Sequence, residues 1–152
     1  LNKLAEGVAA GTFLACAGLN RLGLAEHIRE PISTDIMLPA VAQGAIAIEL
    51  RSADAETALL IAHLNDEATA LCVAAERTFL AKLDGSCRTP IAGLAELRDS
   101  SIRFRGEILT PDGRQCLATE RSGPAETALR LGEDAAAELL DRAGPDFLRV
   151  LA

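Results

Sequence analysis

The sequence lacks tryptophan and tyrosine, and aromatic residues make up only 3% of its 152 residues. Proteins that bind single-stranded nucleic acid stack the bases on aromatic side chains. Positive charge is also in short supply, because 15 Lys+Arg stand against 22 Asp+Glu and the formal net charge is -7. An acidic chain is poorly suited to a phosphate backbone. We therefore expect no nucleic-acid partner.

Long hydrophobic runs and a signal peptide are missing as well. The longest nearly apolar run, residues 9–19, contains Gly and Thr and is too short to cross a bilayer. No basic segment followed by an apolar one stands at the start. We expect no membrane partner and a cytoplasmic location. Because the chain begins with Leu1, not Met, we also expect its natural N-terminus to lie upstream.

The four cysteines are widely spaced and form no C-x-x-C pair, and His27 and His63 show no metal-ligand spacing. This pattern predicts neither a metal site nor a disulfide framework. Cys16, Cys72 and Cys116 lie in apolar stretches and are expected to be small buried hydrophobic residues.

Cys87 is the exception among the cysteines. It lies in the loop-forming stretch L-D-G-S-C-R-T-P and is followed directly by Arg88. A partly exposed thiol beside a cation ionises more easily, and the thiolate is the nucleophile. Cys87 is therefore a candidate functional residue, and the alternative is an incidental loop cysteine.

From about Asp54 onwards, the hydrophobic pattern predicts two helices, three antiparallel strands and a final helical region. This order is typical of a small α+β domain in which helices cover one face of the sheet. The expected elements are a helix capped by Asp54, a helix from the Asn65–Asp66 cap to about Leu83, strands over 91–97, 102–109 and 114–121 with a turn at 110–113, and a helical region from Pro124 that is broken near Gly132 and stopped by Gly144–Pro145.

The first fifty residues have a different, α/β character. They predict the end of a helix closed by Gly7, a strand over 11–17, a helix over 19–28 opened by Gly18, and a buried strand over 45–50. Buried strands need neighbouring strands, and this part of the chain offers too few of them. We infer that the chain is a fragment.

Four segments, in order along the chain, resemble porphobilinogen deaminase, also called hydroxymethylbilane synthase. They read A-G-L-N-R-L-G-L (17–24), L-P-A-V-A-Q-G-A-I-A-I-E (38–49), A-A-E-R-T-F-L (74–80) and L-D-G-S-C-R-T-P-I-A (83–92). The resemblance implies an enzyme of tetrapyrrole biosynthesis. Such an enzyme joins four porphobilinogens head to tail into hydroxymethylbilane and releases ammonia at each step.

The same resemblance implies a dipyrromethane cofactor, held by a thioether at Cys87. Loss of ammonia from porphobilinogen leaves an electrophilic carbon that a thiolate can capture, so the local chemistry of Cys87 agrees. Arg21 matches an arginine that binds the acetate and propionate groups of cofactor or substrate, and just inside a helix opened by Gly18 it is expected to act together with the N–H groups of the helix N-terminus. Without the resemblance, Arg21 would be read as a solvated helix residue. Gln43 and Gly44 match a stretch near the cofactor, and Ala15 and Gly18 are expected to line the same cleft.

The family fold has three domains, of which the first two resemble periplasmic binding proteins. The resemblance assigns residues 1–35 to the end of domain 2, residues 36–53 to a return segment of domain 1, and residues 54–152 to the α+β domain 3. It places the catalytic aspartate in the N-terminal half, outside this chain, so no catalytic residue is expected here and the isolated chain should be inactive. It also implies porphobilinogen and the growing oligopyrrole as partners and a monomeric parent enzyme.

Two positions depart from the family pattern. Ala42 stands where the family usually has Gly, and D-G-S-C (84–87) replaces E-G-G-C. Neither change removes a functional group, so both are expected to be tolerated. Two other interpretations stay open: a non-catalytic, stand-alone small-ligand-binding α+β module, and a truncated reading frame without a role of its own.

Overall fold

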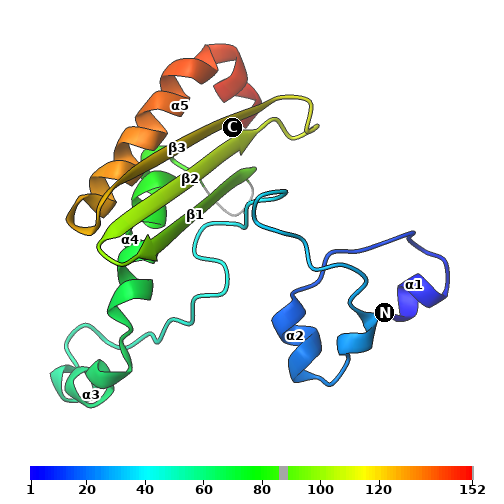
Figure 1. Cartoon of the computed structure of the whole chain (residues 1–152), viewed down its shortest axis with the longest axis horizontal. Helices are drawn as coiled ribbons and strands as arrows, with labels where there is room; N and C mark the ends of the chain where they lie inside the picture. Colours follow the sequence, from blue (N-terminus) through cyan, green and yellow to red (C-terminus); the bar gives the residue numbers. More distant parts are fainter. Residues whose placement is uncertain (86–88, 152) are drawn as a thin grey trace. The chain divides into compact units, whose positions relative to one another are not determined.

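The computed structural model describes residues 1–85 and 89–151, and it divides into two compact units, Leu1–Met37 and Leu38–Ala152. Each unit has helices of its own, and the three strands all belong to the second unit (Figure 1).

The first unit consists of short helices joined by irregular chain. They are α1 (Asn2–Ala5), α2 (Cys16–Arg21) and the 3-10 helix η1 (Ala25–His27). Gly7 follows α1 with φ 74, as expected for a residue that closes a helix. The strand expected over 11–17 and the long helix over 19–28 are both wrong, because residues 11–15 are irregular and α2 ends at Arg21. No residue of this unit is buried, and Phe13 is 75% exposed. A strand is stable only when it pairs with a neighbour, and residues 1–37 supply none.

The second unit begins with an irregular segment, residues 38–53. The strand expected over 45–50 is absent, and Ile46 is 96% exposed. The start of the segment is nevertheless docked. Leu38 is buried, and the carbonyl of Pro39 accepts the Gly93 N–H at 3.0 Å.

The helices α3 (Ala55–Ile61), η2 (Ala62–Leu64) and α4 (Glu67–Lys82) follow, and both predicted caps are confirmed. The Asp54 carboxylate accepts the Thr57 N–H at 3.0 Å, and the Asp66 carboxylate accepts the Thr69 N–H at 2.8 Å. These bonds hold the pKa of both carboxyls below the usual value, because a backbone N–H favours the charged form.

The three predicted strands form one antiparallel sheet in the order β1-β2-β3. They are β1 (Ile91–Arg98), β2 (Ser101–Leu109) and β3 (Cys116–Pro124). The Gly113 N–H donates to the Thr110 carbonyl at 2.8 Å, which confirms the turn between β2 and β3. Alternate residues of β2 from Ile102 to Ile108 are buried, as the sequence alternation predicts.

The C-terminal helical region consists of the 3-10 helix η3 (Ala125–Thr127) and α5 (Ala128–Leu151). The expected break near Gly132 is wrong, since α5 runs through this position. The expected stop at Gly144–Pro145 is found only as an interruption, because Gly144 has φ 68 and ψ 173 but the helical span continues to Leu151.

The core of the second unit lies between the sheet and the two long helices, α4 and α5, which cover one face of it (Figure 1). The rings of Phe79 on α4 and Phe104 on β2 meet at its centre, with centroids 5.0 Å apart and planes tilted by 57°. Helix α3 contributes no buried residue to this core. The α+β domain with covering helices is therefore confirmed.

Within the described residues, no single helix is long and apolar enough to cross a membrane. Residues 55–64 and 67–82 meet that requirement only as a pair of helices bent by 107°.

Candidate functional site

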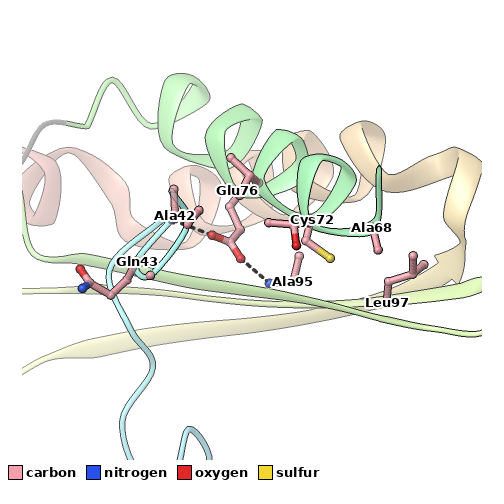
Figure 2. Close-up of a pocket in the computed structure, with 11 residues that line it drawn as sticks. Ala42, Gln43, Ala68, Cys72, Glu76, Ala95 and Leu97 are labelled. Carbon is pink, nitrogen blue, oxygen red and sulfur yellow. Dashed lines mark hydrogen bonds between the residues drawn. The ribbon is translucent and has the colours of Figure 1, made fainter. Parts of the chain in front are cut away.

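Gln43 and Gly44 lie at the rim of a pocket of about 410 Å³ in the second unit. Its walls are the turn at residues 42–45, one side of α4 and the strand β1 (Figure 2). The lining residues are Ala42, Gln43, Gly44, Ala45, Ala68, Thr69, Cys72, Val73, Glu76, Ala95 and Leu97.

The turn itself uses two left-handed residues. Ala42 has φ 59 and Gly44 has φ 87. Two backbone hydrogen bonds close the turn. The Gln43 N–H donates to the Ala40 carbonyl at 3.0 Å, and the Ala45 N–H donates to the Ala42 carbonyl at 3.2 Å. The Gln43 side chain is exposed and points away from Glu76 (Figure 2).

Glu76 holds this turn against the sheet, and sequence reasoning missed it. The side chain leaves α4, is only 5% exposed and divides its two oxygens between two backbone donors. One oxygen accepts the Ala42 N–H at 2.6 Å and the other accepts the Ala95 N–H on β1 at 2.8 Å (Figure 2). The signal was available, since a carboxylate interrupts the apolar stripe of a helix inside the segment A-A-E-R-T-F-L.

The outer edge of β1 is closed by acceptors from outside the sheet. The Gly93 N–H donates to the Pro39 carbonyl at 3.0 Å, and the Ala95 N–H donates to Glu76 at 2.8 Å. These two N–H groups are therefore not free to pair with another strand.

Two of the described cysteines, Cys72 and Cys116, have a thiol pKa above the usual value. Burial raises the pKa of the Cys72 thiol, only partly offset by the Leu97 N–H. Burial and the nearby Glu107 raise the pKa of the Cys116 thiol. Cys72 packs against the core, but it is only half-buried, as is Cys16, so the expectation that both are buried is wrong. Cys116 is exposed at the start of β3, so the expectation that it is buried is wrong.

Ala15, Gly18 and Arg21 belong to the first unit and are all exposed there. Ala15 is the N-cap of α2, Gly18 lies within the helix and does not open it, and Arg21 is its last residue. The expectation that Arg21 acts together with helix N-terminal N–H groups is therefore wrong. A cation at this position instead interacts favourably with the negative end of the helix dipole. Its exposed guanidinium remains chemically suited to a carboxylate.

Cys87 and its neighbours Ser86 and Arg88 lie outside the described residues. The described chain on either side agrees with the predicted loop between a helix and a strand. Helix α4 ends at Lys82 and β1 begins at Ile91.

The pocket beside Glu76 does not fit the carboxylate groups of a dipyrromethane. Of the lining residues within 1–85 and 89–151, none carries a positive charge, and Glu76 alone is charged, with both its oxygens already bonded. Carboxylates are held by Arg, Lys or clustered N–H donors. Within the described residues, this pocket therefore offers Gln43 and Gly44 no cation that could hold a carboxylate ligand beside them.

Two family models match the chain one after the other. Residues 1–59 match "porphobilinogen deaminase, dipyromethane cofactor binding domain", and residues 70–141 match "porphobilinogen deaminase, C-terminal domain". The chain belongs to the porphobilinogen deaminase family. The porphobilinogen deaminase family models divide the candidate residues between them, because Arg21 and Gln43 fall in the first match while Glu76 and Cys87 fall in the second.

Curated relatives agree with the family assignment. The chain is 56% identical over 147 residues to a porphobilinogen deaminase of Paracoccus denitrificans. The aligned region covers 97% of this chain and 47% of the relative. It is 51% identical over 150 residues to the chloroplastic porphobilinogen deaminase of Pisum sativum, with 97% and 41% covered. It is 49% identical over 152 residues to that of Nitrobacter hamburgensis, with 100% and 48% covered. The chain thus spans about half the length of the curated relatives it matches.

Proposed function

We propose that this chain is the C-terminal part of an enzyme that condenses four porphobilinogens into hydroxymethylbilane with release of ammonia. The observation that carries the proposal is the pair of porphobilinogen deaminase matches, in order, over residues 1–59 and 70–141. The substrate partners are then porphobilinogen and the growing oligopyrrole.

The proposed cofactor is a dipyrromethane held at Cys87 by a thioether. The cofactor supplies the primer to which pyrrole units are added. The segment L-D-G-S-C-R-T-P-I-A (83–92), in which Arg88 directly follows Cys87, supports Cys87 as the attachment point, because a thiol beside a cation ionises more readily. Arg21 would pair with carboxylate groups, and Gln43 and Gly44 would offer a polar side chain and an open backbone.

The proposed domain arrangement assigns residues 1–35 to the end of a second domain, 36–53 to a return segment of a first domain, and 54–152 to the third. The first two domains would resemble periplasmic binding proteins. Phe13 and Ile46, 75% and 96% exposed, support this arrangement, because apolar side chains in irregular segments suit strands whose partners lie elsewhere. The catalytic aspartate would lie in the N-terminal half of the enzyme, so this chain alone would be inactive. A monomeric state and a cytoplasmic location complete the proposal.

The full-length protein tests the attachment site. We expect an intact mass that exceeds the sequence mass by one dipyrromethane and a positive reaction with Ehrlich's reagent. Cys87→Ser should lose both, because a hydroxyl is far less nucleophilic than a thiolate.

Cys72→Ser and Cys116→Ser are the matched controls, and both should keep the added mass. A wild-type protein without the added mass, or a Cys87→Ser protein that retains it, would refute the assignment. Consumption of porphobilinogen by the wild-type protein tests the activity separately.

A further inference from the structure

We propose that Glu76 is a positioning residue that sets the place of Gln43 by clamping the turn at residues 42–45 to the edge strand β1. The effect expected on the reaction rests on the proposed function. The clamp itself does not, because it is a property of the described chain.

A carboxylate is the group that this place requires. The Ala42 and Ala95 N–H groups approach different oxygens of Glu76, at 2.6 and 2.8 Å. A glutamine would offer one carbonyl acceptor and would turn its NH₂ group towards the other donor. One backbone N–H would then be left without an acceptor at a side chain that is 5% exposed, which is unfavourable.

The turn needs an external hold because its backbone is strained. Ala42 occupies the left-handed region with φ 59, which disfavours residues that carry a Cβ. Strain of this kind persists only where surrounding contacts impose it. The hydrogen bond from the Ala42 N–H to Glu76 is such a contact, and it acts on the strained residue itself.

Gln43 is the residue whose place depends on the clamp. It follows Ala42 directly, and its exposed side chain points away from Glu76 (Figure 2). Glu76 therefore acts through the backbone and does not touch a ligand on the exposed side of the turn. A displacement of about 1 Å at such a site can lower a rate by about 100-fold.

The test compares full-length Glu76→Gln with wild type in two measurements. In hydrogen exchange, we expect the peptides covering residues 38–45 and 91–98 to exchange at least about tenfold faster in the variant, because a glutamine can bond only one of the two amides at a time and no longer joins the turn to the strand. In kinetics, we expect kcat/KM for porphobilinogen to fall by about 10- to 100-fold. The dipyrromethane should remain attached, because Cys87 is unchanged.

Glu133→Gln is the matched control. This variant removes a carboxylate from α5 that is 56% exposed and lies 3.7 Å from Lys82, so neither measurement should change. Unchanged exchange in Glu76→Gln would overturn the clamp. Faster exchange with unchanged kcat/KM would overturn its role in the reaction. A wild-type protein without activity would contradict the proposed function. The hydrogen-exchange result would still show whether Glu76 holds the turn against β1.

A double-mutant cycle tests the route through Gln43. If Glu76 acts by placing Gln43, then Gln43→Ala lowers kcat/KM and adding Glu76→Gln lowers it little further. Independent, additive losses would contradict the route.

Should Glu76→Gln fail to fold, the same measurements on Glu76→Asp test the clamp. That side chain keeps both acceptor oxygens but is one methylene too short to reach both donors.

Discussion

Gly132 on α5 lies against the backbone of Ala75 on α4, so closely that a Cβ at position 132 would stand 2.3 Å from the Ala75 carbonyl oxygen. The same Cβ would approach the Phe79 nitrogen at 3.3 Å. Because the neighbour is backbone, it cannot turn aside as a side chain would. The absence of a side chain at Gly132 thus sets the distance between the two helices that cover the sheet.

We predict that Gly132→Ala destabilises the full-length protein. Helix propensity alone favours Ala over Gly by about 1 kcal/mol. Overpacking of a filled core costs about 1–3 kcal/mol, and here the clash is with a carbonyl oxygen, so packing decides the sign. Urea unfolding should show a lower free energy of unfolding, and hydrogen exchange should become faster in α4 and α5.

Ala137→Gly on the exposed side of α5 is the matched control for this substitution. Here propensity acts alone, and a loss of about 1 kcal/mol is expected. If Gly132→Ala proved more stable than wild type, the close approach of the two helices would be wrong.

We predict that Ala42→Gly stabilises the protein by about 0.5–1 kcal/mol. The left-handed conformation costs about 1–2 kcal/mol for an L-residue, while Gly loses more backbone entropy on folding, by about 0.5–1 kcal/mol. The φ of 59 at Ala42 places it where Gly has the advantage. The measurement is urea unfolding of the full-length protein.

Ala45→Gly, in the same turn but without a positive φ, provides the contrast and should lower stability slightly. Equal effects of the two substitutions would show that the left-handed strain at Ala42 is absent. The family usually has Gly at this position, and from the sequence Ala42 is expected to be tolerated. The structure adds that the methyl group has a conformational cost.

The elements that sequence predicted well are those whose signals are local. Asp54 and Asp66 cap helices because their carboxylates reach N–H groups three residues away, and the alternation over 102–108 follows from the period of a strand. The break predicted at Gly132 is wrong because this glycine is required by the close approach of α4, whose contact residue Ala75 lies 57 residues earlier in the chain. Glu76 was missed for the same cause, because its partners, Ala42 and Ala95, are 34 and 19 residues away.

The expected strands over 11–17 and 45–50 failed for the opposite reason. Their residues have the apolar composition of buried strands, but a strand needs a partner, and the described chain pairs neither. Of the candidate site, Gln43 and Arg21 came from the resemblance to the family, and their roles stay predictions. Sequence reasoning assigned Arg21 to the wrong end of its helix, since helix boundaries depend on capping that residues 15–21 lack.

Glu138 leads to a prediction about acid stability. Its carboxylate accepts the Thr119 hydroxyl at 2.6 Å and Arg142 at 2.7 Å, and it also binds Arg121, so it ties α5 to β3. These partners hold the pKa of Glu138 below its usual value of 4.5, the Thr119 hydrogen bond contributing most. A lowered pKa in the folded state means that the stabilisation is complete above the unfolded-state value and disappears as the pH falls through the lower folded-state value.

We therefore expect the difference in unfolding free energy between wild type and Glu138→Gln to be largest near neutral pH and to shrink as the pH falls below about 4.5. Other carboxyls titrate equally in both proteins, so the difference isolates Glu138. Urea unfolding between pH 7 and 3 measures it. A difference that grew on acidification would contradict the assignment.

The Cys72 thiol gives the last prediction. Burial raises its pKa, and the negative charges of Glu76, Glu96 and Asp66 act in the same direction. Since only the thiolate is alkylated, we expect native Cys72 to react with iodoacetamide at pH 8 at least about tenfold more slowly than in urea. Mass spectrometry of the labelled peptides measures both rates, and exposed Cys116 serves as the internal reference that should react sooner than Cys72. If native Cys72 reacted as fast as unfolded Cys72, burial would not protect its sulfur, and the raised pKa of this thiol would be wrong.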